Sequence, residues 1–307
     1  MARQMRTILA NLYCKIVRKI TVNSLPIPEY FSRKTRWARK PARRIGIYSA
    51  YYDSSAYLSA HLNSLMENTT SEFDYYIMKN FSRPEESRRF DEIMEYYSFA
   101  HVFRSIAGCI PCPLRHGDSL QRMVSLTDNE IIVICDIDTL FLGHGWDEYV
   151  LKQLEDKTVV GVVTSFEGRT QKGQLPTVLH PSFMAFRRKL LEDNQLDLLS
   201  GEGNDPAYKI TRFLVAHGAF DDKTVCPLLP TRVEYPNEWF SDLSLFGLGG
   251  QPSHGFCTHY GDFFFHFWHS MNYAQGTDIM AADGTVLVPH SVVKQKVKYY
   301  TGEYRSR

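Results

Sequence analysis

The stretch Glu130-Ile-Ile-Val-Ile-Cys-Asp-Ile-Asp-Thr-Leu-Phe141 sets two carboxylates directly after a run of apolar residues. Residues 131–134 are β-branched without polar alternation, a pattern typical of a strand that is buried on both faces of a parallel sheet. Because side chains alternate along an extended strand, Asp136 and Asp138 are expected to point to one side and Ile137 to the other. Two such carboxylates can share a divalent cation, and oxygen ligands with open positions suit Mg2+ or Mn2+.

The position of the two acids matters more than their spacing. With 18 Asp among 307 residues, one Asp-x-Asp is expected by chance, and Asp136 and Asp138 form the only one. They follow what reads as a central strand, and open α/β sheets bind their ligands at the carboxyl ends of such strands. A metal site and a solvated turn are therefore both compatible with the pattern, and the position favours the metal site.

Strands and helices alternate from residue 44 onward, which predicts an α/β fold with a Rossmann-like, mostly parallel sheet flanked by helices. The expected strands are residues 44–50, 73–78, 100–103, 131–134 and 159–166. Helices are expected after Ser54, with Leu58, Leu62, Leu65 and Met66 on one face, from Pro84, and near residues 119–126. Residues 44–275 are expected to form a single catalytic domain.

The chain begins with a basic arm, predicted to span residues 1–43 and to include a linker. Residues 1–44 hold 12 Lys/Arg and one acid, a charge of +11, whereas the remainder carries −10. Residues 8–20 are apolar at helical spacing with basic neighbours, too short and too charged to cross a bilayer. Such a helix can lie on an anionic membrane surface or pack on its own domain. No nucleic-acid-binding module is recognisable in the arm.

The cysteine pattern bears on the compartment. Six cysteines are scattered through a chain that is 44% hydrophobic and long enough to bury a large core without disulfides. A reduced compartment is the simpler interpretation, so we expect a cytoplasmic location with peripheral membrane contact through the arm left open.

Several motifs in their order along the chain resemble one family. They are Ile45-Gly-Ile-Tyr-Ser-Ala50, Arg115-His-Gly-Asp-Ser-Leu-Gln-Arg122, Cys135-Asp-Ile-Asp-Thr139, His180-Pro-Ser-Phe-Met-Ala-Phe186 and His266-Phe-Trp-His-Ser270. Together they resemble the A-type (GT-A) fold of nucleotide-sugar glycosyltransferases, over roughly residues 44–275. The arm and a C-terminal tail, residues 276–307, lie outside the resemblance.

The resemblance implies a metal-dependent glycosyltransferase that moves a sugar from a nucleoside-diphosphate sugar to a glycan or lipid-linked acceptor. It implies that Asp136, Asp138 and a late histidine hold Mn2+ or Mg2+ on the diphosphate. Asp138 is the first choice for a direct ligand, whereas Asp136 could bind through water or hold the ribose. We expect His266 at the metal and His269 near phosphate, because residues three apart on a strand face opposite ways. A core histidine is the alternative for each.

For the nucleotide, the resemblance points to the end of the first strand, namely Ser49, Ala50, Tyr51 and Asp53. The ring of Tyr51 could lie on the base, and Asp53 could accept a hydrogen bond from base or ribose. Asp53 could equally cap the next helix. Arg115 and His116 are placed to face phosphate or sugar, and a solvated loop would explain them nearly as well.

An inverting transfer would also need a base for the acceptor hydroxyl. Asp205 is the first candidate and Glu202 the second. Asp205 also has a structural explanation as a helix N-cap, with Pro206 at the first helical position and Gly218 after the last turn. A helix N-terminus is expected to lower the pKa of Asp205 and to make it a weaker base. The sequence leaves the stereochemistry open.

Two other classes of protein fit part of the pattern. A sugar-phosphate nucleotidyltransferase would also use a carboxylate-bound metal, but residues 49–53 lack the glycine-rich loop that such enzymes carry after the first strand. A non-catalytic module that docks on membrane or nucleic acid through its arm would leave the two acids and the late histidines without a shared purpose.

Overall fold

The computed structural model describes residues 44–80, 83–104, 116–165, 175–199, 205–236, 240–243, 246, 248–252, 254–268, 270–281 and 284–305. Its centre is a seven-stranded sheet with the order β3-β2-β1-β4-β7-β6-β8. Among these strands only β7 runs against the others, since it pairs antiparallel with both β4 and β6. The expected α/β fold with a mostly parallel sheet is confirmed.

The first half of the sheet is built from strand–helix units close to those predicted. Its elements are β1 (Ile45–Tyr51), α2 (Ser55–Asn68), β2 (Phe73–Lys79), α3 (Pro84–Met94), β3 (Ala100–Arg104), α4 (His116–Ser125) and β4 (Ile131–Cys135). All five residues of β4 are buried, as the unbroken apolar run indicates. One detail of the prediction is wrong: Met66 is exposed, whereas Leu58, Leu62 and Leu65 are buried.

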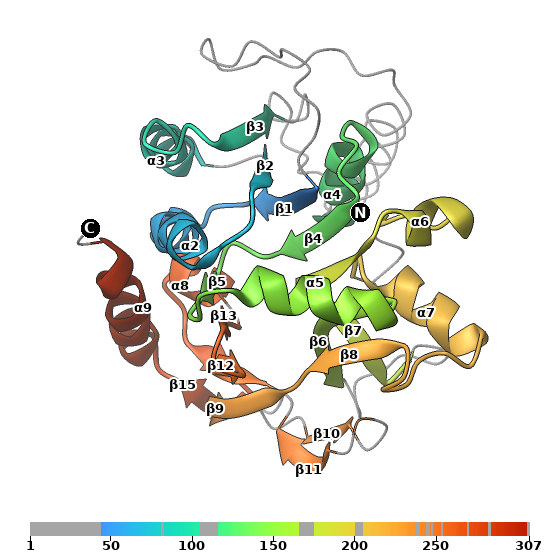
Figure 1. The fold of residues 1–307 in the computed structure, drawn as a ribbon. Coiled ribbons are helices and arrows are strands. Elements are labelled where there is room, and N and C mark those ends of the chain that lie inside the picture. Colours follow the sequence, from blue (N-terminus) through green and yellow to red (C-terminus); the bar gives the residue numbers. More distant parts are fainter. Residues whose placement is uncertain are drawn as a thin grey trace, which may run out of the picture.

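The second half adds α5 (Trp146–Asp156), β6 (Val159–Ser165), β7 (Thr177–Arg187), α6 (Lys189–Asp193), α7 (Tyr208–Ala216) and β8 (Val225–Leu228). Helices cover both faces of the sheet (Figure 1). One core joins the sheet to α2, α3 and α5 through Leu58, Phe90 and Trp146. A second core joins the opposite face to α4, α6 and α7 through residues such as Leu120 and Ile210.

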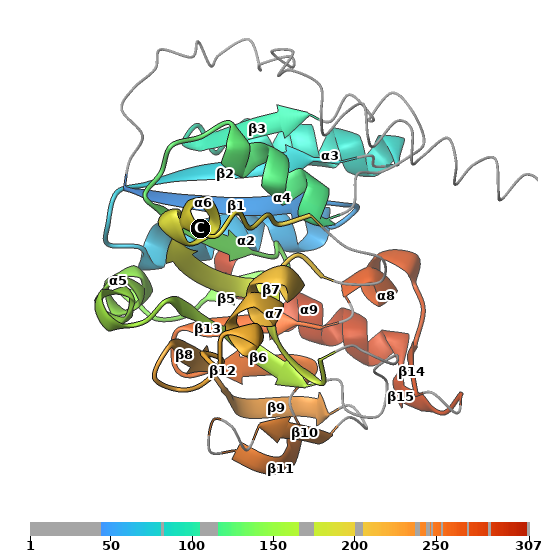
Figure 2. The same cartoon turned by 90° about the vertical axis from the view of Figure 1, so that its right-hand side faces the viewer.

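A second sheet extends the first at the end of β4. It has the order β5-β13-β12-β9, from β5 (Thr139–Phe141), β13 (Phe264–Phe267), β12 (Gly255–Tyr260) and β9 (Pro230–Pro236). Two short ribbons, β10 (Phe240–Leu243) with β11 (Leu248–Pro252) and β14 (Ile279–Met280) with β15 (Val286–Val288), complete the strands described. Figure 2 shows β13, β12 and β9 below β1, β2 and β3 of the main sheet, with α9 (His290–Arg305) beside them.

The segment after residue 276, which the resemblance did not cover, packs on the rest of the protein. Helix α9 lies beside α2, and α8 (Ser270–Gln275) precedes it (Figure 1). Val293 and Val297 of α9 are buried in one cluster with Tyr57 and Ala60 of α2. Residues 1–43 lie outside the described part of the chain.

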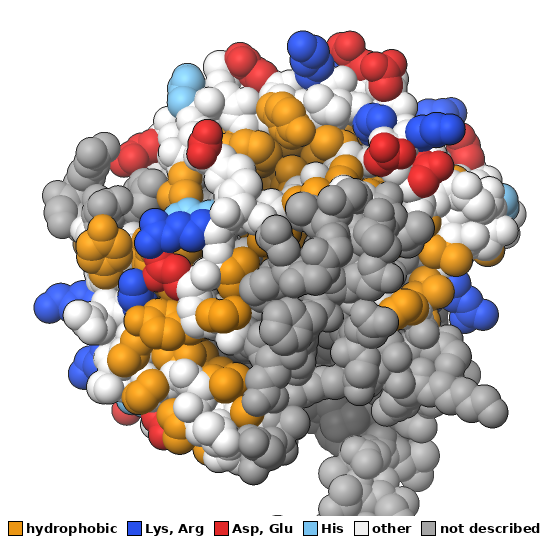
Figure 3. Space-filling view, turned by 90° about the horizontal axis from the view of Figure 1, so that it is seen from below, with side chains coloured by type: hydrophobic (Ala, Val, Ile, Leu, Met, Phe, Trp, Pro, Cys, Tyr) orange, Lys and Arg blue, Asp and Glu red, His pale blue; other side chains and the backbone are white. Residues whose placement is uncertain are grey.

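The surface of the described residues is of mixed character. Large exposed hydrophobic side chains include Tyr96 and Tyr299, and also Met280 and Val286, which pair across β14 and β15. On the face drawn in Figure 3, charged side chains of both signs are interspersed with hydrophobic ones. No helix among the described residues is long and apolar enough to cross a membrane.

Candidate active site

The two carboxylates lie in a tight turn that joins the two sheets. Strand β4 ends at Cys135, and the backbone N–H of Asp136 donates to the carbonyl of Ser182 at 3.2 Å. The chain turns through residues 136–138 into β5, and Thr139 Oγ1 donates to the Asp136 carbonyl at 2.6 Å. Both acids therefore lie in a turn and not in the extended strand that was expected. The side chains still point in the expected directions, because Ile137 is buried in the core while the two carboxylates lie together.

His266 reaches these acids through pairing of β13 with β5. His266 stands opposite Thr139 in the antiparallel register, and the N–H of Phe267 donates to the Asp138 carbonyl at 2.9 Å. As a result His266 Nε2 lies 3.3 Å from Asp138 Oδ1. One ligand atom from each of Asp136, Asp138 and His266 lies within 4.8 Å of the other two. The predicted trio is thus brought together, whereas His269 lies outside the described residues.

The chemistry of this trio fits a divalent cation. Two carboxylate oxygens and one imidazole nitrogen supply three ligands, which leaves positions for phosphate oxygens or water. The imidazole of His266 is almost fully buried, and its Nδ1 has no hydrogen-bond partner among the described residues. Burial, with the neighbouring Asp138 second, raises the pKa of Asp136 to about 8. A cation bound by the acids would oppose that rise, because it favours the charged carboxylates.

His116 joins the same site from the start of α4. Its Nε2 lies 3.3 Å from Asp136 Oδ1. Burial lowers the pKa of His116, while Asp205 and Asp138 oppose that change by favouring the charged ring. His116 is the first residue of α4 and does not precede the helix as expected. Its predicted neighbour Arg115 lies outside the described residues.

His180 is a further site residue to which the sequence assigned no role. It lies on β7, with its ring centroid 6.0 Å from that of His266 and 4.4 Å from that of Trp268. Its Nδ1 accepts a hydrogen bond from the Ser182 N–H at 3.1 Å, so the neutral ring carries its proton on Nε2. Burial and the nearby His266 lower the pKa of His180 well below its ordinary value. The ring is therefore a neutral donor close to His266.

Asp205 lies close enough to the candidate cation site that it interacts electrostatically with His116. The expected N-cap role is wrong: α7 begins at Tyr208 with Ala207 at the N-cap, and Asp205 contributes its carbonyl to the Tyr208 N–H at 3.0 Å. The expected fall in the pKa of Asp205 is also wrong. Desolvation by neighbouring atoms raises the pKa of Asp205, although the residue as a whole is exposed, and His116 only partly opposes the rise. The second candidate base, Glu202, lies outside the described residues.

The predicted nucleotide residues are placed differently. Ser49 is fully buried, with its Oγ 3.4 Å from Cys135 Sγ, and Ala50 is half-buried. Tyr51 is also fully buried: its ring packs on Phe90, and its hydroxyl donates to Glu86 Oε2 at 3.1 Å. The structure thus contradicts the expectation that Tyr51 lies on a base.

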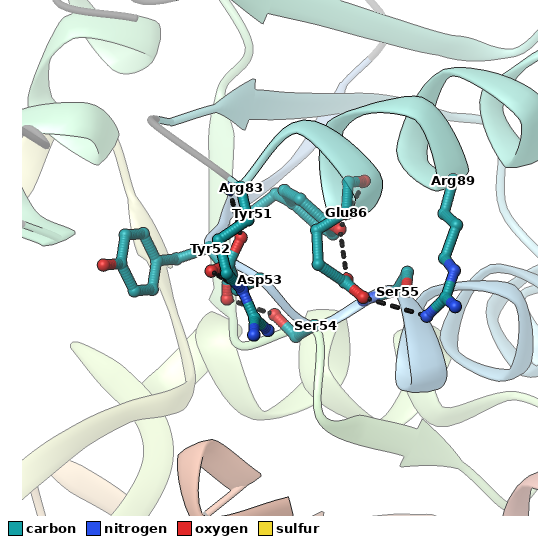
Figure 4. A network of polar contacts seen from close by, with 8 residues as sticks. All are labelled: Tyr51, Tyr52, Asp53, Ser54, Ser55, Arg83, Glu86 and Arg89. Atoms are coloured by element: carbon teal, nitrogen blue, oxygen red, sulfur yellow. Dashed lines mark hydrogen bonds and ion pairs between the residues drawn. The ribbon is translucent and has the colours of Figure 1, made fainter. Parts of the chain in front are cut away.

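Asp53 takes part in a reciprocal arrangement between α2 and α3 (Figure 4). Its carboxylate accepts hydrogen bonds from the backbone N–H of Arg83, the N-cap of α3, at 3.0 Å and from Arg83 Nε at 2.9 Å. In return, Glu86 of α3 accepts from the N–H of Ser55, the first residue of α2, at 3.1 Å. Asp53 therefore caps α3 and not α2, and its carboxylate is engaged in protein contacts.

Tyr52 is the exposed ring at the end of β1. Its side chain is 39% exposed and points away from the Asp53 and Glu86 contacts (Figure 4). Tyr52 directly follows β1, and β1 lies next to β4, which leads into Asp136. The sequence could have indicated Tyr52, since two adjacent tyrosines follow one strand. The choice between them depends on which ring is buried in the core.

The fold and the site together define an α/β protein with a candidate divalent-cation site at the carboxyl edge of its main sheet. No protein-family model matches the chain, and no curated protein matches it. Solved structures do match. The chain is similar to the mannosyltransferase PcManGT from Pyrobaculum calidifontis in complex with GDP-Man and Mn2+, at 13% identity over 70% of this chain and 61% of that chain, with a TM-score of 0.46.

Two further structures show a similar degree of likeness. TarS from S. aureus, in complex with UDP-GlcNAc, is 15% identical over 54% of this chain and 53% of that chain, with a TM-score of 0.40. Glucosyl-3-phosphoglycerate synthase from Mycobacterium tuberculosis, with Mn2+, UDP and glucosyl-3-phosphoglycerate, is 16% identical over 60% and 68%, with a TM-score of 0.41. The chain spans 61% of the length of PcManGT, about half of the TarS chain of residues 1–349 and 33% of the longer TarS chain.

Proposed function

We propose that this chain is a metal-dependent glycosyltransferase that moves a sugar from a nucleoside-diphosphate sugar to a hydroxyl group of a glycan or other acceptor. One observation carries the proposal. Asp136 and Asp138 come from the turn after β4 and His266 comes from β13, far along the chain, yet one ligand atom of each lies within 4.8 Å of the others. They do so at the carboxyl edge of the main sheet, where α/β proteins bind nucleotides.

The reaction makes specific demands on the site. A bond forms between the acceptor oxygen and the anomeric carbon of the sugar, while the bond from that carbon to the diphosphate oxygen breaks. When bound by Asp136, Asp138 and His266, Mn2+ or Mg2+ would supply Lewis-acid stabilisation of the negative charge on the departing diphosphate. The neutral imidazole of His180, with its proton on Nε2, is suited to donate a hydrogen bond to phosphate or sugar.

The proton of the acceptor hydroxyl needs a base, and Asp205 is the candidate. Its pKa is raised by desolvation, and a raised pKa makes a carboxylate a better base near neutral pH. His116 lies near both Asp205 and Asp136, so it can hold Asp205 in place or contact the phosphates. This role applies to a transfer that inverts the configuration of the sugar.

For the nucleoside, we propose that Tyr52 takes the role first assigned to Tyr51. An exposed aromatic ring can stack on any base, because every base has a π-face. Asp53 would contribute indirectly, since its contacts with Arg83 fix the backbone that follows Tyr52.

The function is tested by the products released from a panel of nucleotide sugars, with and without Mn2+. Slow, Mn2+-dependent release of a nucleoside diphosphate from one donor, abolished in Asp138→Ala, is the expected result. Asp262→Ala is a matched control, because Asp262 is an exposed carboxylate just before β13. Formation of a nucleoside triphosphate and a sugar phosphate when pyrophosphate is added to the donor would instead favour a nucleotidyltransferase. Equal turnover in Asp138→Ala and the unmodified chain would refute the proposal.

A further inference from the structure

Strand β5, which follows the two acids, is held on one edge by a helix and not by another strand. It is an edge strand of its sheet and pairs only with β13 among the described strands. Unpaired backbone groups on an edge strand need partners when they are buried. Helix α2 supplies them from side chains three and four residues apart, which lie on one helix face.

The contacts from α2 to β5 are specific. His61 Nδ1 lies 3.0 Å from the Thr139 carbonyl, Ser64 Oγ accepts from the Phe141 N–H at 3.1 Å, and Asn68 Nδ2 donates to the Phe141 carbonyl at 2.7 Å. Both His61 and Ser64 are fully buried. Three polar side chains of α2 thus occupy the positions that a neighbouring strand would fill with its backbone.

The contact made by His61 leads directly to the metal-binding turn. Thr139 Oγ1 lies 3.2 Å from His61 Nδ1 and donates to the Asp136 carbonyl at 2.6 Å. Thr139 also stands opposite His266 in the pairing of β5 with β13. Thr139, which is held by His61, therefore contacts the backbone of Asp136 and sets the register of His266.

His61 also contacts the other end of the turn. Its Nε2 lies 4.0 Å from the thiol sulfur of Cys135, the last residue of β4 and the one before Asp136. Burial lowers the pKa of His61 to about 4, so the ring is neutral near neutral pH. A neutral ring with its proton on Nδ1 donates to the Thr139 carbonyl and leaves Nε2 as an acceptor toward Cys135. His61 therefore spans the turn from its first flanking residue to its last.

We propose that His61 is a positioning residue for the cation site: it fixes the turn between Cys135 and Thr139, and so the separation of the Asp136 and Asp138 carboxylates, without touching metal or substrate. This inference rests on the proposed function, because it concerns the same cation. It predicts that binding of Mn2+ depends on a side chain of α2 that lies outside the ligand set.

The test compares Mn2+ binding by the full chain and its variants, followed by the electron paramagnetic resonance signal of free Mn2+. In His61→Leu the Kd for Mn2+ is expected to rise about 10- to 100-fold, the usual cost of losing an outer partner of a metal ligand. In His61→Asn, whose side-chain amide can still donate to the Thr139 carbonyl, the Kd should return to within a few-fold of the unmodified chain.

The control is Leu62→Ala, which removes a fully buried side chain from the same helix without touching the turn. It is expected to lower the melting temperature while leaving the Kd for Mn2+ unchanged. The inference is overturned if His61→Leu binds Mn2+ as tightly as the unmodified chain, or if Leu62→Ala weakens binding equally. Failure of the unmodified chain to bind Mn2+ would instead overturn the metal-dependent function itself, and this inference with it.

Discussion

Asp138 Oδ1 and His266 Nε2 lie 3.3 Å apart, although the two residues come from opposite halves of the chain. The contact exists because β13 pairs with β5, the strand that begins directly after Asp138. A short edge strand therefore carries the connection between the main sheet, which delivers the acids, and the second sheet, which delivers the histidine. The cation site depends on this pairing as much as on the ligands themselves.

The first prediction concerns the histidine. Replacing His266 by Ala removes one of three ligands, and we expect the Kd for Mn2+ to rise by about 100-fold or more, since losing even an outer partner typically costs 10- to 100-fold. Isothermal titration calorimetry measures this directly. His144→Ala is the matched control, because His144 is exposed and contacts only the Glu67 carbonyl in the described structure. Equal Mn2+ affinity in His266→Ala and the unmodified chain would contradict the assignment.

The second prediction concerns pH. In the metal-free protein the pKa of Asp136 is about 8, raised by burial and then by Asp138, whereas an unfolded Asp titrates near about 3.9. Between these values the folded state binds more protons than the unfolded state. The stability that protonated Asp136 contributes is therefore fully present below the pKa of the unfolded state and is lost as pH rises through the pKa of the folded state.

Mn2+ must displace that proton, so its affinity should increase as pH rises toward 8. The rise in melting temperature caused by Mn2+ is expected to be larger at pH 8 than at pH 6. Differential scanning fluorimetry with and without the metal measures both values. In Asp136→Asn the dependence on pH should become flatter, because the titrating carboxyl is gone. A metal-induced shift that is the same at both pH values would count against this prediction.

The sequence predicted the main sheet well because its signals are strong there. Apolar runs such as residues 131–134 and 159–166 are long enough to identify buried strands, and the acids at the end of β4 follow from one of them. The second sheet gave little signal. Strand β5 has three residues and its partner β13 has four, which is too short for an alternating pattern to separate them from a loop.

The errors in the site have a common physical cause. The choice between Tyr51 and Tyr52 depends on which ring the core takes, and the contacts of Tyr51 with Phe90 and Glu86 come from α3, which follows later in the chain. The pKa of Asp205 was predicted from a helix dipole, but desolvation by the surrounding elements dominates. Both outcomes are set by tertiary contacts that local sequence does not contain.

The third prediction tests the base. Asp205→Asn keeps the size of the side chain but cannot accept the acceptor's proton, so transfer should slow by about 100- to 10,000-fold, the usual contribution of general-base catalysis. Binding of Mn2+ should stay within a few-fold of the unmodified chain, because Asp205 is outside the ligand trio. Asp193→Asn, at an exposed ion pair with Lys189, is the control. Transfer at an unchanged rate in Asp205→Asn would remove this residue from the mechanism.

The fourth prediction separates the two tyrosines at the end of β1. Stacking of a base on an aromatic ring contributes about 1–3 kcal/mol, so Tyr52→Ala should raise the KM for the donor by about 5- to 150-fold. Tyr51→Phe removes only the hydroxyl that donates to Glu86, and it should lower the free energy of unfolding by about 1–3 kcal/mol while leaving the donor KM unchanged. Steady-state kinetics and urea denaturation measure the two effects.

Tyr96→Ala controls for the loss of an exposed ring, since Tyr96 is 86% exposed near the end of α3. If Tyr51→Phe raised the donor KM and Tyr52→Ala did not, the assignment of Tyr52 would be wrong.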